Sequence, residues 1–396
     1  MKNTLYIYIV FLFLSFNSFA QKKVTTYYPT KAVKEIFEGK ISKKDTIYNG
    51  TYEIYYEDGK LWQKGQFKEN QLDGLWFDYY NDGKTVRQEL NYVNGNLEGI
   101  TKTFYITGQL EQIQPYKNNL LNGKLQMFYP DGKLMEESEY VLGILNGKTS
   151  SFLEDGAIRA IRNFVNGIEY GEFVEYYENH KIKEKSFKKN GIYEGKFIGY
   201  YKDFNDGDVQ KICYYKNGIL EGEFTGYYSS GNIMLKCNYV NNKIEGVYKK
   251  FYDYKDLIFI DSLFVKEIGN YENYVKIGEW KSFYMNGKLH TIGKFKDDKY
   301  DGEWLIYHPD GKLKQKGNFT NGNENGYFIN YLNNEKINFE GNYIDSKKDG
   351  LWKWYYENGK VWKEINYKLG ETILPFKIYD ENGNMQLIEK DIEKKE

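Results

Sequence analysis

The sequence predicts an all-β protein, an elongated antiparallel array of about 13 tandem β-hairpins of about 24 residues each. Three observations support this fold class. A glycine recurs thirteen times between residues 50 and 350, and an aromatic residue follows each copy five positions later. The composition includes 41 Tyr, 25 Phe and 39 Gly but only 5 Pro, so strand and turn formers dominate over helix formers.

The recurring glycine marks the start of each repeat and is taken as position zero. Most repeats have 24 residues, but the second has one extra, the seventh three and the ninth eight. Position six is Tyr except at Leu153, His308 and Leu332, and position two is usually large and apolar. The thirteen glycines are Gly50, Gly74, Gly99, Gly123, Gly147, Gly171, Gly195, Gly222, Gly246, Gly278, Gly302, Gly326 and Gly350.

Each repeat reads as a hairpin. Positions one to six alternate between two faces of a first strand, because successive side chains of a strand point in opposite directions. Asp-Gly or Asn-Gly at positions eight and nine supplies the positive φ of a tight turn. A return strand such as 60–67 then carries an apolar residue at position eleven and an aromatic near seventeen, before a polar loop such as 68–73. Turn glycines at position nine include Gly59, Gly132, Gly287, Gly311 and Gly359.

The ends of the chain depart from the repeat. Residues 1–20 combine Lys2, an apolar stretch over 5–16 and small residues before Gln21, which predicts a signal peptide. A membrane anchor is the alternative, but the stretch is shorter than the roughly 20 residues needed to span a bilayer. We expect export to the periplasm, the outer-membrane surface or the extracellular space. Residues 21–49 and 374–396 are expected to cap the array 50–373 as half-repeats, the second with a charged tail.

Charge and motifs disfavour several classes of function. The chain has 55 Lys and Arg against 56 Asp and Glu, so no global field favours nucleic acid. No later segment is apolar enough for a transmembrane helix. Its three histidines fall in different repeats without metal-ligand spacing, and no nucleophile or phosphate-binding motif occurs. The sequence therefore predicts a non-enzyme without catalytic residues, metal or cofactor.

Two cysteines occupy the same position of adjacent repeats. Cys213 and Cys237 both lie at position fifteen, which is often a small residue in the other repeats. Equivalent positions of successive hairpins are two strand spacings apart, about 9.6 Å. A disulfide needs Cα atoms within about 7 Å, so we expect two free thiols.

Two sets of residues are candidates for interaction. Trp62 and Trp362 lie at position twelve of the first and last repeats and are expected either to contact a partner or to seal the ends of the array. Repeat nine, 246–277, has eight extra residues and an apolar segment assigned to 261–277. This segment either forms an extra hairpin or partner site or is a neutral insertion. Its candidate contact residues are Leu263, Phe264, Tyr271 and Tyr274.

The pattern G-x-W-x-x-Y-Y-x-x-G-K at 350–360, with looser copies at 278–288 and 302–312, resembles the bacterial variant of the MORN repeat. Proteins of this kind are catalogued as YwqK-type, toxin–antitoxin-like antitoxins. The resemblance implies a β-array for protein or membrane contacts with no catalytic residues, and an exported chain departs from the antitoxin of a cytoplasmic toxin. A weaker resemblance, at Trp354-Tyr355-Tyr356, is to choline- and glucan-binding repeats. We expect a protein-interaction scaffold, with binding of a cell-envelope glycan as the alternative.

Overall fold

The computed structural model describes residues 22–41, 45–203, 208–253 and 264–388. Every regular element in these residues is a β-strand, and the 37 strands belong to one antiparallel sheet. The predicted fold class is therefore confirmed. The chain divides into two units, and each is described by itself. The N-terminal unit comprises 1–158 with 163–168, and the C-terminal unit comprises 159–162 with 169–396.

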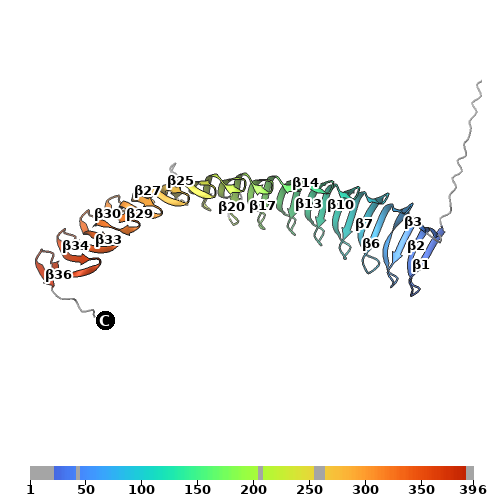
Figure 1. The fold of residues 1–396 in the computed structure, drawn as a ribbon, viewed down its shortest axis with the longest axis horizontal. Coiled ribbons are helices and arrows are strands. Elements are labelled where there is room, and N and C mark those ends of the chain that lie inside the picture. Colours follow the sequence, from blue (N-terminus) through green and yellow to red (C-terminus); the bar gives the residue numbers. More distant parts are fainter. Residues whose placement is uncertain (1–21, 42–44, 204–207, 254–263, 389–396) are drawn as a thin grey trace, which may run out of the picture. The chain divides into compact units, whose positions relative to one another are not determined.

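Within each unit the strands follow one another in chain order (Figure 1). The N-terminal unit contains β1 (Lys22–Tyr27), β2 (Val33–Ile41), β3 (Thr46–Tyr55), β4 (Leu61–Lys68), β5 (Gln71–Leu72), β6 (Gly74–Tyr79), β7 (Val86–Val93), β8 (Asn96–Leu97), β9 (Gly99–Phe104), β10 (Leu110–Lys117), β11 (Leu120–Leu121), β12 (Gly123–Phe128), β13 (Leu134–Val141) and β14 (Ile144–Phe152). Residues of β15 (Ile158–Val165) and β16 (Ile168–Glu169) are divided between the units.

The C-terminal unit consists mostly of long strands, with two-residue strands at β19, β22 and β31. Its strands are β17 (Gly171–Tyr176), β18 (Ile182–Lys189), β19 (Ile192–Tyr193), β20 (Gly195–Tyr200), β21 (Val209–Lys216), β22 (Ile219–Leu220), β23 (Gly222–Tyr227), β24 (Ile233–Val240), β25 (Lys243–Phe251), β26 (Val265–Glu272), β27 (Val275–Phe283), β28 (Leu289–Lys296), β29 (Lys299–Tyr307), β30 (Leu313–Thr320), β31 (Asn323–Glu324), β32 (Gly326–Tyr331), β33 (Ile337–Ile344), β34 (Lys347–Tyr355), β35 (Val361–Lys368), β36 (Glu371–Tyr379) and β37 (Met385–Ile388).

The hairpin turns have the geometry that position nine requires. In repeat ten the Gly287 N–H donates to the Tyr284 carbonyl at 2.9 Å, and the Tyr284 N–H donates to the Lys288 carbonyl at 2.8 Å. Gly287 has φ +78°, a left-handed conformation that glycine adopts without steric cost. His180 and Glu335 hold the same position in their repeats with φ of +66° and +67°.

One face of the sheet is packed. Along the centre of this face, residues at position two alternate with residues at position fifteen. Position two is large or β-branched, and position fifteen is small in most repeats. Position two is buried in ten repeats: Trp76, Thr101, Leu125, Thr149, Phe173, Phe197, Trp280, Trp304, Phe328 and Trp352. Positions two and fifteen face each other across the hairpin, so Trp280, for example, lies opposite the small Gly293 on the same face.

The small residue also makes room for the next repeat. A Cβ added to Gly341 would lie 2.2 Å from Cδ2 of Trp352, which no side chain could tolerate without movement. Tyr343, at position seventeen, meets the Trp352 ring edge-on with centroids 4.8 Å apart, and the indole N–H donates to the Asn342 carbonyl at 2.8 Å. The same close approach joins Gly65 to Trp76, Gly269 to Trp280, Gly293 to Trp304 and Gly317 to Phe328.

In nine repeats the tyrosine at position six forms a hydrogen bond to the next repeat. Its hydroxyl donates to the backbone carbonyl of position five in the following repeat, a contact we call the inter-repeat tyrosine bond. It measures 2.7 Å for Tyr80–Phe104 and Tyr105–Phe128, 2.8 Å for Tyr129–Phe152, 3.1 Å for Tyr177–Tyr200, 2.6 Å for Tyr201–Tyr227, 2.9 Å for Tyr228–Phe251, and 2.8 Å for Tyr252–Phe283, Tyr284–Tyr307 and Tyr356–Tyr379. His308 replaces the tyrosine and places Nε2 3.2 Å from the Tyr331 carbonyl.

The terminal segments also form hairpins. In the N-terminal unit β1 pairs with β2, and the Tyr28 hydroxyl donates to the Tyr55 carbonyl at 2.8 Å, which is an inter-repeat tyrosine bond. Residues 22–41 thus form a hairpin that is joined to the following repeat by the same kind of bond as the repeats of the array. In the C-terminal unit β36 and β37 pair from Tyr379 and Met385 onward. The expected signal peptide and the charged tail, 389–396, lie outside the described residues.

The extra residues of repeat nine lie between Phe251 and Val265, so the assignment of the insertion to 261–277 is wrong. Phe251 pairs with Val265 as Phe283 pairs with Leu289 in the next repeat. From Val265 onward the register is regular, because Gly269 occupies position fifteen and Tyr271 position seventeen. Counting forward from Gly246 displaced these residues from their positions. Residues 254–263, including Leu263, lie outside the described part of the chain.

Both cysteines are expected to stay reduced and unreactive in the native protein. Cys213 faces Phe197 and Cys237 faces Phe224, in two separate hairpins, and both thiols are free and buried. Burial raises the pKa of Cys237 to about 11, so the nucleophilic thiolate is scarce near neutral pH. A maleimide should modify two groups per chain after denaturation without reductant and far fewer in the native state. Finding no reactive group after denaturation would show a disulfide and contradict this prediction.

Candidate binding surface

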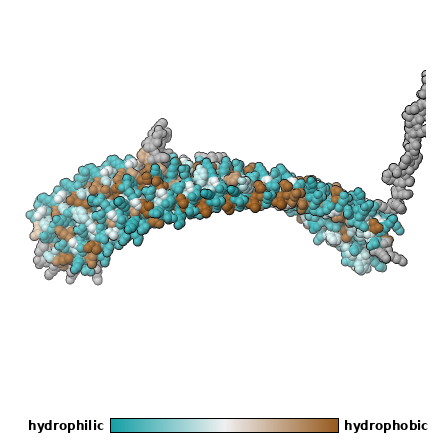
Figure 2. Space-filling view, turned by 45° about the horizontal axis from the view of Figure 1, so that its top comes forward, coloured by the Kyte–Doolittle hydropathy of each residue, from teal (hydrophilic) through white to brown (hydrophobic). Residues whose placement is uncertain are grey.

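The opposite side of the sheet, which we call the open face, is built by positions one, three, fourteen and sixteen. Its residues vary from repeat to repeat, whereas the packed face keeps its pattern of large and small residues. Exposed aliphatic and aromatic side chains are frequent there. Position one is exposed at Leu75 (54%), Ile100 (50%), Val247 (54%), Tyr327 (43%) and Leu351 (42%). Figure 2 shows apolar and polar side chains intermixed along the visible surface of each unit.

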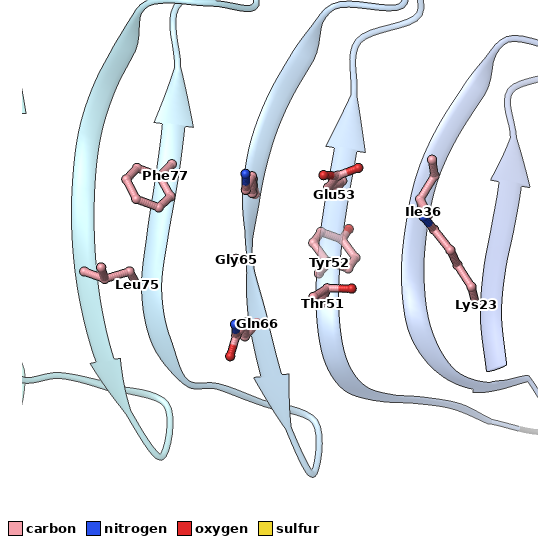
Figure 3. Close-up of a pocket in the computed structure, with 10 residues that line it drawn as sticks. Lys23, Ile36, Thr51, Tyr52, Glu53, Gly65, Gln66, Leu75 and Phe77 are labelled. Atoms are coloured by element: carbon pink, nitrogen blue, oxygen red, sulfur yellow. The ribbon is translucent and has the colours of Figure 1, made fainter. Parts of the chain in front are cut away.

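Each unit has a hollow in the open face, and both hollows lie at equivalent repeat positions. In the N-terminal unit, residues of β1, β2, β3, β4 and β6 line a hollow of about 490 Å³, with Leu75 and Phe77 on β6 and Thr51 and Glu53 on β3 (Figure 3). The hollow of the C-terminal unit encloses about 590 Å³ and is lined by Glu172, Val174, Lys185, Phe187, Lys196 and Ile198. In both, positions one and three of two successive repeats flank positions fourteen and sixteen of the first.

The charges of the open face pair with one another at many repeats. In the N-terminal unit Lys124 binds Glu137 at 2.7 Å, and this hydrogen bond lowers the pKa of the Glu137 carboxyl. In the C-terminal unit Lys281 binds Glu279 at 2.7 Å. Exposed pairs of this kind contribute at most about 1 kcal/mol each. They leave a mixed surface of apolar and charged groups, which suits recognition of a protein surface.

Position twelve packs against the position-six tyrosine of the same repeat. In the N-terminal unit Trp62 stacks on Tyr56 with ring centroids 5.4 Å apart and is half-buried. In the C-terminal unit Trp362 lies 6.2 Å from Tyr356 and is 41% exposed. His290 holds the same position 4.4 Å from the Tyr284 ring. Contact of the two tryptophans with a partner stays a prediction, and Trp362 has the more accessible ring.

The candidates of repeat nine do not form a cluster. Tyr271 is part of the packed face, where its ring meets Trp280 edge-on at 5.2 Å. Phe264 is half-buried beside the turn at Gly287. Tyr274 lies in a loop and has φ +75°, and its side chain is 49% exposed. Of this set, Tyr274 alone presents a largely accessible side chain among the described residues.

The sequence singles out positions one, three, four and twelve as the most variable, which includes two of the four open-face positions, but it does not reveal the role of position six. The tyrosine was visible as a recurring residue, but its bond to a carbonyl of the next repeat requires the register of neighbouring hairpins. Open-face positions carried a usable signal, because they vary most within the chain. Among the described residues no group of three or more His, Cys, Asp or Glu could hold a metal ion, and no helix could cross a membrane.

Comparison with known proteins identifies the type of repeat. The model of the MORN repeat variant matches eight stretches, at 48–69, 72–94, 97–118, 121–141, 220–241, 276–297, 300–321 and 348–369. Repeats five, six, seven, nine and twelve fall outside these stretches. Each has a local departure: Leu153 or Leu332 at position six, His180 at position nine, or an insertion. The structure nevertheless gives all five the hairpin fold.

Solved structures and curated proteins add little. The chain is 13% identical to the "Crystal Structure of TcdB2-TccC3", covering 92% of this chain and 23% of that one with a TM-score of 0.18. A second match, also 13% identical, is the "Structure of Photorhabdus luminescens Tc holotoxin pore, Mutation TccC3-D651A", with coverage of 92% and 22% and a TM-score of 0.17. This chain thus spans less than a quarter of those proteins. No curated protein matches.

Proposed function

We propose that this chain is a non-catalytic scaffold that holds partner proteins on its open face, in the cell envelope or outside the cell. The proposal rests on the pair of hollows at equivalent repeat positions, each lined by residues particular to its repeats. MORN repeats serve protein and membrane interactions and are not a catalytic module, which supports this class of function. The apolar signal-like segment of residues 1–20 supports the location.

The hollow of the N-terminal unit offers a direct test. Leu75→Glu with Phe77→Lys gives repeat two the residues that repeat ten carries as Glu279 and Lys281, so the fold should persist. We expect the double variant to lose about tenfold or more of its affinity for a partner that the wild type captures from its own envelope fraction, because two apolar contacts become charges. Undiminished capture of every partner would contradict the proposal.

The alternative is a carbohydrate-binding module that uses aromatic platforms, and the exposure of Trp362 favours it. Trp362→Lys is a matched change, because repeat eleven carries Lys314 at position twelve. Calorimetric titration with cell-wall glycan separates the two functions. Saturable binding that this variant abolishes, together with open-face variants that bind normally, would favour the alternative.

A further inference from the structure

Two lysines of the C-terminal unit lie directly opposite each other on the open face, and we call them the lysine pair. Lys236 is on β24, at position fourteen of repeat eight, and Lys249 is on β25, at position three of repeat nine. Both residues are exposed. Residues in this relation have Cβ atoms about 5 Å apart, and like charges placed there destabilise a sheet.

The same two positions hold opposite charges at other junctions between repeats. In the N-terminal unit Glu89 faces Lys102 and binds it at 3.2 Å. In the C-terminal unit Glu364 binds Lys377 at 3.7 Å, across the junction from position fourteen to position three. The junction therefore accepts a carboxylate at position fourteen, and the fold of the hairpins does not require a lysine at 236.

The neighbours of the lysine pair supply no negative charge. Thr225 and Ile268 lie opposite the pair on its two outer sides. Asn238 and Val247 are two residues away along the two strands, on the same face. Within the part of the chain that the structure describes, neither lysine takes part in an ion pair. Both ammonium groups are therefore available to a ligand.

Carboxylates limit the positive charge to a short stretch of the open face. Glu223 and Glu245 both lie opposite Asn238, diagonal to the lysine pair. Glu245 already accepts a backbone N–H at 2.8 Å. In the next repeat Lys281 is bound to Glu279 at 2.7 Å. The two available ammonium groups thus form a local site between charges of the opposite sign.

We propose that the lysine pair binds an acidic segment of a partner protein, with one carboxylate on each ammonium group. This inference rests on the proposed scaffold function and names the chemistry of a partner on the open face. The partner supplies the counter-charge that the sheet lacks, and hydrogen bonds between ionised groups are stronger than those between neutral ones. Val247, which is 54% exposed, offers an apolar contact beside the pair.

The extent of the charge favours a protein segment over other polyanions. Basic clusters that bind anionic lipid contain about 4–8 Lys or Arg, and DNA-binding surfaces neutralise a comparable number of phosphates. Here two ammonium groups are available, and carboxylates of the chain lie on either side of them. A membrane or a nucleic acid would bring further negative charge against Glu223 and Glu279, whereas a short acidic segment would not.

Lys236→Glu separates binding from folding. It gives this junction the Glu–Lys arrangement of the other junctions, so the thermal unfolding temperature should equal or exceed that of the wild type. Lys189→Glu is the matched control, because it changes the net charge by the same amount. Lys189 is exposed at position eighteen of repeat six, where repeat nine carries Glu272, so the change should be tolerated.

Fluorescence anisotropy of the full chain with fluorescein-labelled octaglutamate measures the binding. We expect saturable binding to the wild type and to Lys189→Glu, and a dissociation constant at least about tenfold higher for Lys236→Glu. The affinity of the wild type should fall as the salt concentration rises from about 50 to about 300 mM, because exposed charges are screened.

Four results would overturn the proposal. Two are a wild type that does not bind octaglutamate at low salt and equal affinities of the wild type and Lys236→Glu. A third is binding of phosphatidylserine vesicles, but not of the peptide, that Lys236→Glu abolishes. The fourth is full capture of every envelope partner by Lys236→Glu. In that last case the scaffold function still stands if the double variant of the N-terminal hollow loses those partners, so the two proposals fail separately.

Discussion

Replacing Gly341 with serine should destabilise the last repeats by about 3 kcal/mol. Serine is the better strand residue, so local propensity alone predicts a small gain. The new Cβ, however, would lie 2.2 Å from the Trp352 ring, which is 1% exposed and cannot move into solvent without losing its burial. Urea unfolding followed by tryptophan fluorescence measures the loss.

A second substitution separates the clash from other effects. Trp352→Thr copies repeat five, where Thr149 faces Ser138 of the preceding repeat on neighbouring strands. We expect the double variant Gly341→Ser, Trp352→Thr to be more stable than the sum of the single changes implies, by about 1 kcal/mol or more. Additive losses would show that ring contact is not the cause.

Gly199→Ser is the matched control for the glycine. Its added Cβ would meet Lys211 and Phe197 at 3.3 Å, and the flexible lysine can move aside. The expected loss is below about 1 kcal/mol. A loss as large as that at Gly341 would mean that serine is poorly tolerated in these strands for another reason.

The fold could be predicted from the sequence because each repeat contains the residues that form its own turn and those that face each other across its hairpin. Gly59 and Gly287 could be assigned to turns from their neighbours, since the need for positive φ is local. The small residue at position fifteen was visible too, but its cause was not. The clash that excludes a side chain there comes from the following repeat, and only the register between hairpins places Trp352 over Gly341.

The surface was less predictable for a physical reason. Positions that build the hairpins carry the same kind of residue in every repeat, so they can be recognised within one chain. Binding positions vary between repeats and resemble ordinary exposed polar or apolar residues. Tyr271 illustrates the opposite error, in which a residue of the packed face was predicted to contact a partner. It was taken for part of an inserted segment because the count from Gly246 did not allow for the extra residues before Val265. The pairing of Asn270 with Ile277 shows that Tyr271 belongs to the regular hairpin.

Removing the inter-repeat tyrosine bonds of repeats six to ten should destabilise the C-terminal unit by about 5 kcal/mol in total. Tyr177, Tyr201, Tyr228, Tyr252 and Tyr284 each donate one hydrogen bond to the next repeat, at 2.6 to 3.1 Å. A bond of this type contributes about 1 kcal/mol, and its loss leaves a half-buried carbonyl without its donor. Phenylalanine keeps the ring and removes only the hydroxyl.

The sum should be nearly additive, since stability in a repeat array is a sum of local and neighbour terms. Hydrogen exchange of the strand amides, read repeat by repeat, should show faster opening at the substituted repeats and little change in repeats eleven to thirteen. The matched control is Tyr200, Tyr227 and Tyr307 to Phe. These are position-five tyrosines that supply carbonyls to the bonds, and their own hydroxyls are not donors in them. Equal losses from the two sets would reject the inter-repeat tyrosine bond as a stabilising contact, as would a Leu332→Tyr variant that gains no stability where the bond is naturally absent.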